Sequence, residues 1–318
     1  MNPLATEQVS SVVAGLGIPQ NAVDVSRTKP PVVSWDSVTQ YKRGALGGTW
    51  IDHEKTSGFG FCTLGYNVHM PGNGEEPYFM TAAHCSKLQG VTEGTAFWQK
   101  DHNDSSHYIG VEVWDEHFFY GNYYGNYCPP SRACRYTDAM VGHYESPGYP
   151  AFGYLPYPSN GWNDGTLAYY TCGGCFKYIV SEGVWTYSGQ IVAKWGVTTG
   201  ATAAQIQGWG SSGTCVTVEP AGRLDTAGIQ IQLQCQSVAE GTNDNQWVAG
   251  PGDSGGPVIS TIENEAYQVE AVGILWGSNC PSAEVLEDCV ESEEGNLNTF
   301  TFSAMGFLKA EYGNFSTY

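Results

Sequence analysis

Gly252-Asp253-Ser254-Gly255-Gly256-Pro257 is the stretch that decides how this chain is read. A serine here stands among glycines, which lack a Cβ, adopt unusual φ values and let backbone approach a ligand closely. The pattern predicts a tight turn that exposes a serine Oγ and turns backbone N–H groups toward one point. Acyl transfer needs that combination of a nucleophile and donors for a developing oxyanion. The alternative is an ordinary glycine-rich β-turn.

A histidine upstream favours the chemical interpretation. His84 ends the run Phe79-Met80-Thr81-Ala82-Ala83-His84, so it is expected at the end of an apolar strand. A lone histidine more often has a structural role. A serine hydroxyl, however, is a weak nucleophile without an adjacent base, and histidine takes up a proton near neutral pH.

These two stretches resemble the His and Ser motifs of chymotrypsin-like serine peptidases, and they occur in the order found in that family. Arg135–Val141 resembles the family's Asp motif, which makes Asp138 the expected third member. Asp115 is the alternative, but it follows His84 closely for the strands that must intervene. The resemblance implies that Ser254 attacks the peptide carbonyl, His84 acts as the base and Asp138 orients the imidazole.

Three further segments resemble strands of bacterial streptogrisin-type secreted proteases: Cys62–Val68, Lys194–Gly200 and Gly273–Cys280. The resemblance covers roughly residues 44–310 and implies an all-β fold. The implied fold consists of two antiparallel six-stranded Greek-key barrels with the active site between them, followed by a short helix near Ser303–Tyr312.

The implied organisation has three parts. Residues 1–43 form a pro-segment remnant or N-terminal extension, 44–158 the first barrel and 159–318 the second barrel with the terminal helix. The extension has no basic and apolar regions typical of a signal peptide. Leu16–Val23 resembles the end of a pro-region, so we expect a zymogen whose leader lies outside this numbering.

The same resemblance implies an oxyanion hole made by the backbone N–H groups of Gly252 and Ser254. It implies no metal and no cofactor. The resemblance implies that Asp253 pairs either with a freed N-terminus, as in animal relatives, or with an internal arginine, for which Arg132 and Arg135 are the candidates. Gly47-Gly48 weakly resembles the glycines that follow a zymogen cleavage site.

Substrate binding is expected along an extended segment. The segment Leu275-Trp276-Gly277 should pair with the substrate backbone as an added strand. The position that binds a basic side chain in trypsin-like members is Val248 here, followed by Ala249 and Gly250, which favours an apolar or aromatic residue before the scissile bond. The cysteine that streptogrisin-type enzymes carry just before the Ser motif is absent. An acidic run at 284–294 leaves a preference for basic residues open.

Ten cysteines form an even set without metal-type spacing, which favours disulfides and an oxidising compartment. The Cys172-Gly173-Gly174-Cys175 motif has a redox alternative, but it lacks the βαβ setting of such motifs. The expected pairs, the first of them implied by the family, are Cys62–Cys85, Cys128–Cys134, Cys172–Cys175, Cys215–Cys235 and Cys280–Cys289.

Charge limits the function classes further. The chain has 13 basic and 32 acidic residues, a net charge of −19, which argues against binding to nucleic acid or to an anionic membrane surface. No apolar run approaches the ~18–20 residues that span a bilayer. Together with these limits, the resemblance implies a secreted monomer that acts on polypeptides. A catalytically inactive binding or adhesion module is the alternative.

Overall fold

The structure is a computed structural model, and it describes residues 44–72, 76–123, 126–145, 150–156, 176–208, 214–242, 248–263, 265–278 and 299–318. The chain divides into two units, Met1–Val33 and Ser34–Tyr318, and all described residues belong to the second. The predicted pro-segment, the Cys172–Cys175 and Cys280–Cys289 pairs and the acidic run at 284–294 lie outside them.

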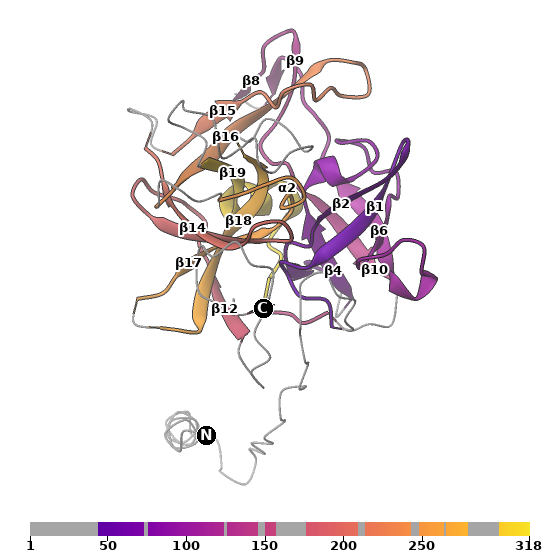
Figure 1. The fold of residues 1–318 in the computed structure, drawn as a ribbon. Coiled ribbons are helices and arrows are strands. Elements are labelled where there is room, and N and C mark those ends of the chain that lie inside the picture. Colours follow the sequence, from indigo (N-terminus) through magenta and orange to yellow (C-terminus); the bar gives the residue numbers. More distant parts are fainter. Residues whose placement is uncertain are drawn as a thin grey trace, which may run out of the picture. The chain divides into compact units, whose positions relative to one another are not determined.

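Short strands dominate the fold, as the alternation of apolar segments with glycine-rich turns predicts. The first sheet has the strand order β2-β1-β5-β6-β10-β4-β3 (Figure 1). Its strands are β1 (Trp50–Lys55), β2 (Gly58–Thr63), β3 (Asn67–His69), β4 (Pro77–Thr81), β5 (Ala96–Trp98), β6 (Tyr108–Asp115) and β10 (Met140–Tyr144).

The second sheet has the order β11-β12-β18-β17-β13-β14-β16-β15, with β19 pairing to β16 and β18 and β9 pairing to β16. Its strands are β9 (Arg132–Arg135), β11 (Tyr154–Pro156), β12 (Phe176–Glu182), β13 (Ile191–Gly196), β14 (Gly200–Ile206), β15 (Val216–Val218), β16 (Gln230–Gly241), β17 (Pro257–Thr261), β18 (Gln268–Ser278) and β19 (Thr299–Ala304). A separate hairpin joins β7 (Asn122–Tyr123) to β8 (Asn126–Tyr127).

The two-sheet, all-β architecture expected from the sequence is confirmed, with differences in detail. Among the described residues, the sheets hold seven and ten strands, where six each were expected. In the first sheet, the chain leaves the strand conformation between β2 and β3, so the two count as separate strands. Gly65 lies in this break and packs so closely on β4 that a Cβ would lie 2.6 Å from the Met80 carbonyl oxygen. In the second, short flanking strands are added, and the β12–β18 and β16–β9 pairs are parallel rather than antiparallel.

The barrel boundary predicted at 158/159 stays a prediction, because residues 157–175 are not described. Strands β9 and β11 precede that boundary but pair within the second sheet.

A hydrophobic core cluster with residues from both sheets joins them. Tyr66 and Met80 of the first sheet's segments pack with Trp195, Ile259 and Ile274 of the second, all almost fully buried. The Tyr66 hydroxyl also donates to the Val258 carbonyl at 2.5 Å. These contacts between the sheets lie next to the two loops that matter below, the loop after β4 and the loop before β17.

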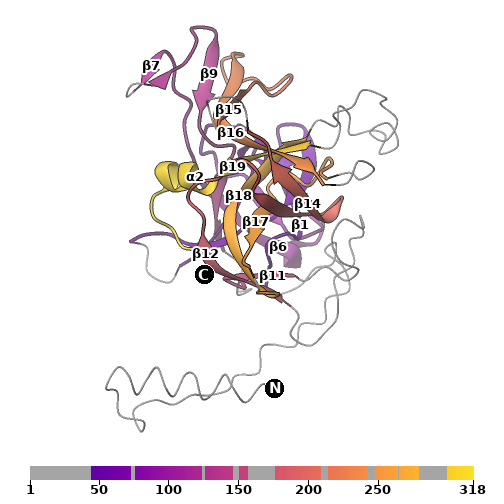
Figure 2. The same ribbon diagram turned by 90° about the vertical axis from the view of Figure 1, so that its left-hand side faces the viewer.

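The expected terminal helix is present as α2 (Met305–Tyr312). It packs against β18 and β19 (Figure 2) and buries Met305, Leu308 and Tyr312, which share one helical face. The Cys62–Cys85, Cys128–Cys134 and Cys215–Cys235 disulfides are present as predicted. None of the described helices has both the length and the apolar character that a bilayer crossing requires.

Candidate active site

His84 lies in a single 3-10 turn, Ala83–Cys85, directly after β4. Its Nδ1 lies 2.8 Å from Asp138 Oδ2, and its backbone N–H donates to Asp138 Oδ1 at 3.0 Å. The two bonds fix both the position and the plane of the imidazole, and Nε2 is the ring nitrogen left for a further partner. The His84 side chain is 19% exposed, whereas Asp138 is fully buried.

Asp138 precedes β10 and is surrounded by donors. Gln89 Nε2 donates to Oδ1 at 3.0 Å, and Arg223 Nη1 donates to Oδ2. Burial alone would raise the pKa of Asp138, but the charges of His84 and Arg223 and the bond from His84 outweigh it and hold the pKa well below the usual range. Asp138 is therefore a carboxylate at any physiological pH.

The alternative aspartate, Asp115, has a different partner. Its Oδ1 lies 2.6 Å from Arg135 Nη1, and both side chains are buried. Its Oδ2 accepts the backbone N–H of Gly90 at 2.6 Å. The structure therefore brings Asp138, and not Asp115, to His84.

The glycines around Ser254 are required by the backbone. Gly252 has φ +93°, and a Cβ there would lie 2.1 Å from the Phe61 ring. Gly255 has φ +90°, and a Cβ would lie 2.0 Å from Thr81 Oγ1. Among the described residues, the N–H groups of Gly252 and Ser254 have no acceptor, whereas Gly255 N–H donates to the Leu275 carbonyl at 2.7 Å.

The Ser254 turn and the His84 turn are held together through the end of β2. Thr63 N–H donates to the Ser254 carbonyl and Thr63 Oγ1 donates to the Gly252 carbonyl, both at 2.8 Å. The neighbouring Cys62 forms the disulfide to Cys85, next to His84. Within the described part of the chain, no hydrogen bond joins Ser254 Oγ to His84.

Asp253 is buried, and its partner is not the one expected. Its Oδ2 lies 2.7 Å from Nζ of Lys194 on β13, with both side chains fully buried. The expected partners, Arg132 and Arg135, pair instead with Glu219 and Asp115. The expectation was wrong because both arginines already have other partners, Glu219 at the surface for Arg132 and the buried Asp115 for Arg135.

The Asp253 carboxylate also organises the backbone around it. Oδ2 accepts the N–H of Gly250 at 2.9 Å, and Oδ1 accepts the N–H of Thr198 at 2.8 Å. Burial lowers the pKa of Lys194, and the charge of Asp253 opposes that shift. The pair therefore ties the Ser254 loop to the β13–β14 turn.

A cleft of about 440 Å³ opens beside Ser254. Predicted substrate residues Ala249, Gly250, Leu275, Trp276 and Gly277 line it. Val248 does not, because its branched apolar side chain is 2% exposed and packs in the core of the second sheet. Five further residues that the sequence did not predict also line the cleft: Pro220, Ala221, Arg223, Pro251 and Ser278.

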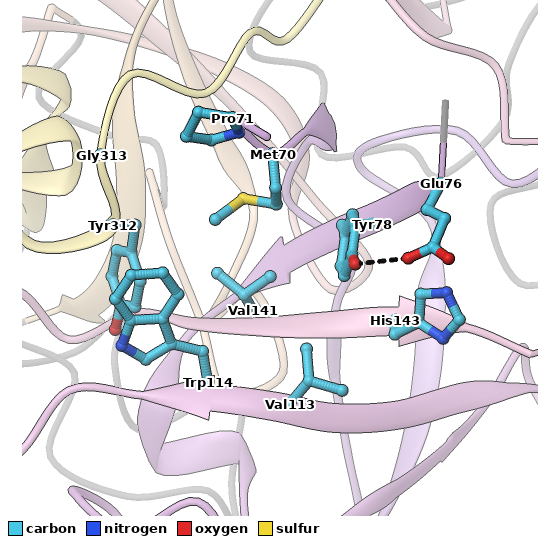
Figure 3. Close-up of a pocket in the computed structure, with 10 residues that line it drawn as sticks. All are labelled: Met70, Pro71, Glu76, Tyr78, Val113, Trp114, Val141, His143, Tyr312 and Gly313. Carbon is cyan, nitrogen blue, oxygen red and sulfur yellow. Dashed lines mark hydrogen bonds between the residues drawn. The ribbon is translucent and has the colours of Figure 1, made fainter. Parts of the chain in front are cut away.

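A second cavity, of about 530 Å³, lies between the first sheet and the end of α2. Figure 3 shows Trp114 beside Tyr312 at one end and the Tyr78–Glu76 hydrogen bond, 2.9 Å long, at the other. None of the predicted site residues lines this cavity. The cleft beside Ser254 is therefore the candidate active site.

Within the described part of the chain, two groups of side chains come close enough to share a metal ion. In the first, His53 lies beside Cys62 and Cys85, whose sulfurs are consumed by their disulfide. In the second, Asp52 already accepts from Trp50 Nε1 at 2.6 Å and lies 2.8 Å from His102 Nδ1. Neither group touches the cleft beside Ser254.

No protein-family model matches the sequence, and no curated protein matches it either. Solved structures are similar in fold. A glutamic acid-specific serine protease, described as using a histidine triad in substrate binding, has a TM-score of 0.50 at 19% identity, covering 86% of this chain and all of that one.

Two further similar structures are bacterial. Thermobifida fusca protease A has a TM-score of 0.47 at 16% identity, and Cellulomonas bogoriensis chymotrypsin one of 0.46 at 17%. Both cover 86% of this chain, which in turn covers 98% and 97% of them. The two-barrel fold of chymotrypsin-like serine proteases, expected from the sequence motifs, is the fold of this chain.

Proposed function

We propose that this chain is a secreted serine endopeptidase that hydrolyses peptide bonds through a covalent acyl-enzyme. Ser254 Oγ attacks the carbonyl, His84 accepts the proton and returns it to the leaving amine, and Asp138 stabilises the imidazolium. The observation that carries the proposal is the 2.8 Å contact between His84 Nδ1 and Asp138, tied through Cys62 and Thr63 to the Ser254 turn.

The N–H groups of Gly252 and Ser254 are the proposed oxyanion donors. Their lack of an acceptor among the described residues supports this role, because a donor already bonded to protein would not serve a developing oxyanion. Losing one such donor typically raises the barrier by ~2.7–4 kcal/mol.

The substrate backbone binds along β18. Strand β17 pairs with β18 only as far as Ile274, and beyond Leu275 the β17 side of β18 has no strand partner among the described residues. Trp276, Gly277 and Ser278 line the cleft on that open edge. An extended peptide can add there as an antiparallel strand.

An apolar or aromatic side chain before the scissile bond is the proposed preference. Ala249, Gly250 and Leu275 give the cleft small and apolar walls, and the described lining contains no carboxylate to hold a basic side chain. A basic preference would have to come from the acidic run at 284–294, outside the described residues. Cleavage of a random peptide library distinguishes the two.

Secretion and activation belong to the same proposal. Three disulfides fit an oxidising compartment. Residues 1–43 are proposed to be a pro-segment, and the active form is proposed to be a monomer. N-terminal sequencing of fully active protein tests the pro-segment, since retention of Met1 in that form would contradict it.

A fluorophosphonate probe tests the central claim. We expect covalent labelling of the wild-type protein at Ser254 and none in Ser254→Ala, which should bind substrate but lose nearly all turnover. Ser260→Ala is the matched control, because Ser260 lies on β17 away from the cleft and should label normally. An unlabelled wild-type protein would instead favour a binding module built on a protease fold.

A further inference from the structure

Arg223 extends from the β15–β16 connection to the candidate active site. Its Nη1 donates to Asp138 Oδ2, the same oxygen that lies 2.8 Å from His84 Nδ1. Its Nη2 donates to the Trp276 carbonyl at 3.3 Å, and the guanidinium lies over the Trp276 ring, 5.5 Å from its centroid. A cation is therefore held by three contacts beside the proposed triad.

The charges that face His84 come from three elements. Asp138, before β10, is the carboxylate in contact with it. Arg223 and Lys55, the latter at the end of β1, are the cations, and His84 in turn helps to lower the pKa of His53 on β1. Burial lowers the pKa of His84 most, Arg223 lowers it further, and Asp138 opposes both. Arg135 on β9 acts on Asp138 rather than on His84.

Arg223 therefore competes with His84 for the charge of one carboxylate oxygen. A protonated His84 would carry its positive charge next to that of Arg223. Its partner oxygen, Asp138 Oδ2, already accepts a hydrogen bond from Arg223. Like charges in proximity disfavour the protonated form of a histidine. The neutral imidazole, which is the form able to accept the serine proton, is favoured as a result.

We propose that Arg223 is a positioning residue that shares Asp138 with His84, keeps the imidazole unprotonated in acidic solution, and so extends the activity of the enzyme to lower pH. This inference rests on the proposed peptidase function. Arg223 also lines the cleft, and its side chain is 25% exposed, so a bound substrate removes water from it and strengthens its electrostatic effect.

The test compares Arg223→Gln, which removes the charge but keeps a donor, with Arg223→Lys, which keeps the charge. The acidic limb of the kcat/KM profile should move up by about one pH unit in Arg223→Gln. At a pH well below the limb, kcat/KM relative to the plateau should therefore fall about tenfold. Arg223→Lys should restore most of the wild-type profile, and Arg132→Gln, which removes a surface arginine paired with Glu219, should not move the limb.

An unmoved limb in Arg223→Gln would overturn the proposal. So would an equal shift in Arg223→Lys, because geometry and not charge would then be responsible. NMR titration of the His84 ring provides a readout independent of turnover. An upward shift of its midpoint in Arg223→Gln supports the electrostatic role even if wild-type Ser254 does not label, and an unchanged midpoint refutes that role even if Ser254 does.

Discussion

Lys194 shows how much one side chain contributes to the geometry of the candidate site. It is fully buried on β13 and balances Asp253, whose carboxylate accepts the N–H groups of Gly250 and Thr198. A buried ion pair is not strongly stabilising in itself, but a buried charge without its partner is costly.

Lys194→Met should therefore destabilise the fold by about 3–5 kcal/mol, measured by urea unfolding, because Asp253 is left as an uncompensated buried charge. The double variant Lys194→Met/Asp253→Asn should recover part of that loss. Lys87→Met is the control, because Lys87 pairs with Glu54 at the surface and should cost only ~0–1 kcal/mol. Equal losses from Lys87→Met and Lys194→Met would argue against the role given to the buried pair.

At the scale of the element, the end of β18 combines two functions. One edge continues to pair with β19 as far as Ser278, and the other is open toward the cleft. Gly277 lies on this open stretch, and a Cβ built there meets no atom within 4 Å. The fold can accept a side chain at this position, but a bound peptide would have to compete with it.

Gly277→Val should therefore raise KM about tenfold or more while changing stability by no more than ~0.5 kcal/mol. Fluorophosphonate labelling of Ser254 should remain close to the wild-type rate, because the small probe does not need the open edge. Steady-state kinetics on a peptide substrate and a urea unfolding curve check both parts. An unchanged KM would mean that the substrate does not pair along β18.

The elements also show which features the sequence could predict. The turn around Ser254 could be predicted from contiguous residues, because positive φ and close backbone approach require glycine at Gly252 and Gly255. Arg223 reaches Asp138 from 85 positions away along the chain, and no local pattern records that contact. Lys194 did leave a signal: a lysine within the apolar strand Ile191–Gly196 requires a buried acid, and that signal was missed.

At the scale of the whole molecule, buried carboxyl groups link stability to pH. Burial, with the neighbouring Asp115 and Glu93, raises the pKa of Glu112 to about 8, and burial raises that of Glu311 on α2 to about 7. Groups whose pKa is raised on folding hold more protons in the folded state, so stability falls as pH rises toward the raised pKa.

The fall begins near the unfolded glutamate pKa of ~4.3, and above pH ~6.5 the histidines no longer oppose it. Histidines with lowered pKa values, such as His53 at about 3, act in the opposite direction, but only below the unfolded histidine pKa of ~6.5. Asp115, with a pKa raised to about 6, has completed its change by then. Between pH ~6.5 and ~8.5, Glu112 and Glu311 therefore dominate among these groups.

The free energy of unfolding should fall by on the order of 2 kcal/mol across that window. Glu112→Gln should remove much of the fall, since the amide has no proton to lose. Glu219→Gln, at an exposed surface position, should leave it intact. Urea unfolding at both ends of the window measures the difference, and a wild-type protein more stable at the upper end would contradict the assignment.

The buried Lys194–Asp253 pair also bears on how the proposed pro-segment could keep the protein inactive. The cation that pairs with Asp253 is Lys194, which lies within strand β13. A new N-terminal amino group, created by cutting the chain before residue 44, is therefore not needed to balance the charge of Asp253. Removal of residues 1–43 would therefore leave in place both the ion pair at Asp253 and the backbone hydrogen bonds that its carboxylate accepts.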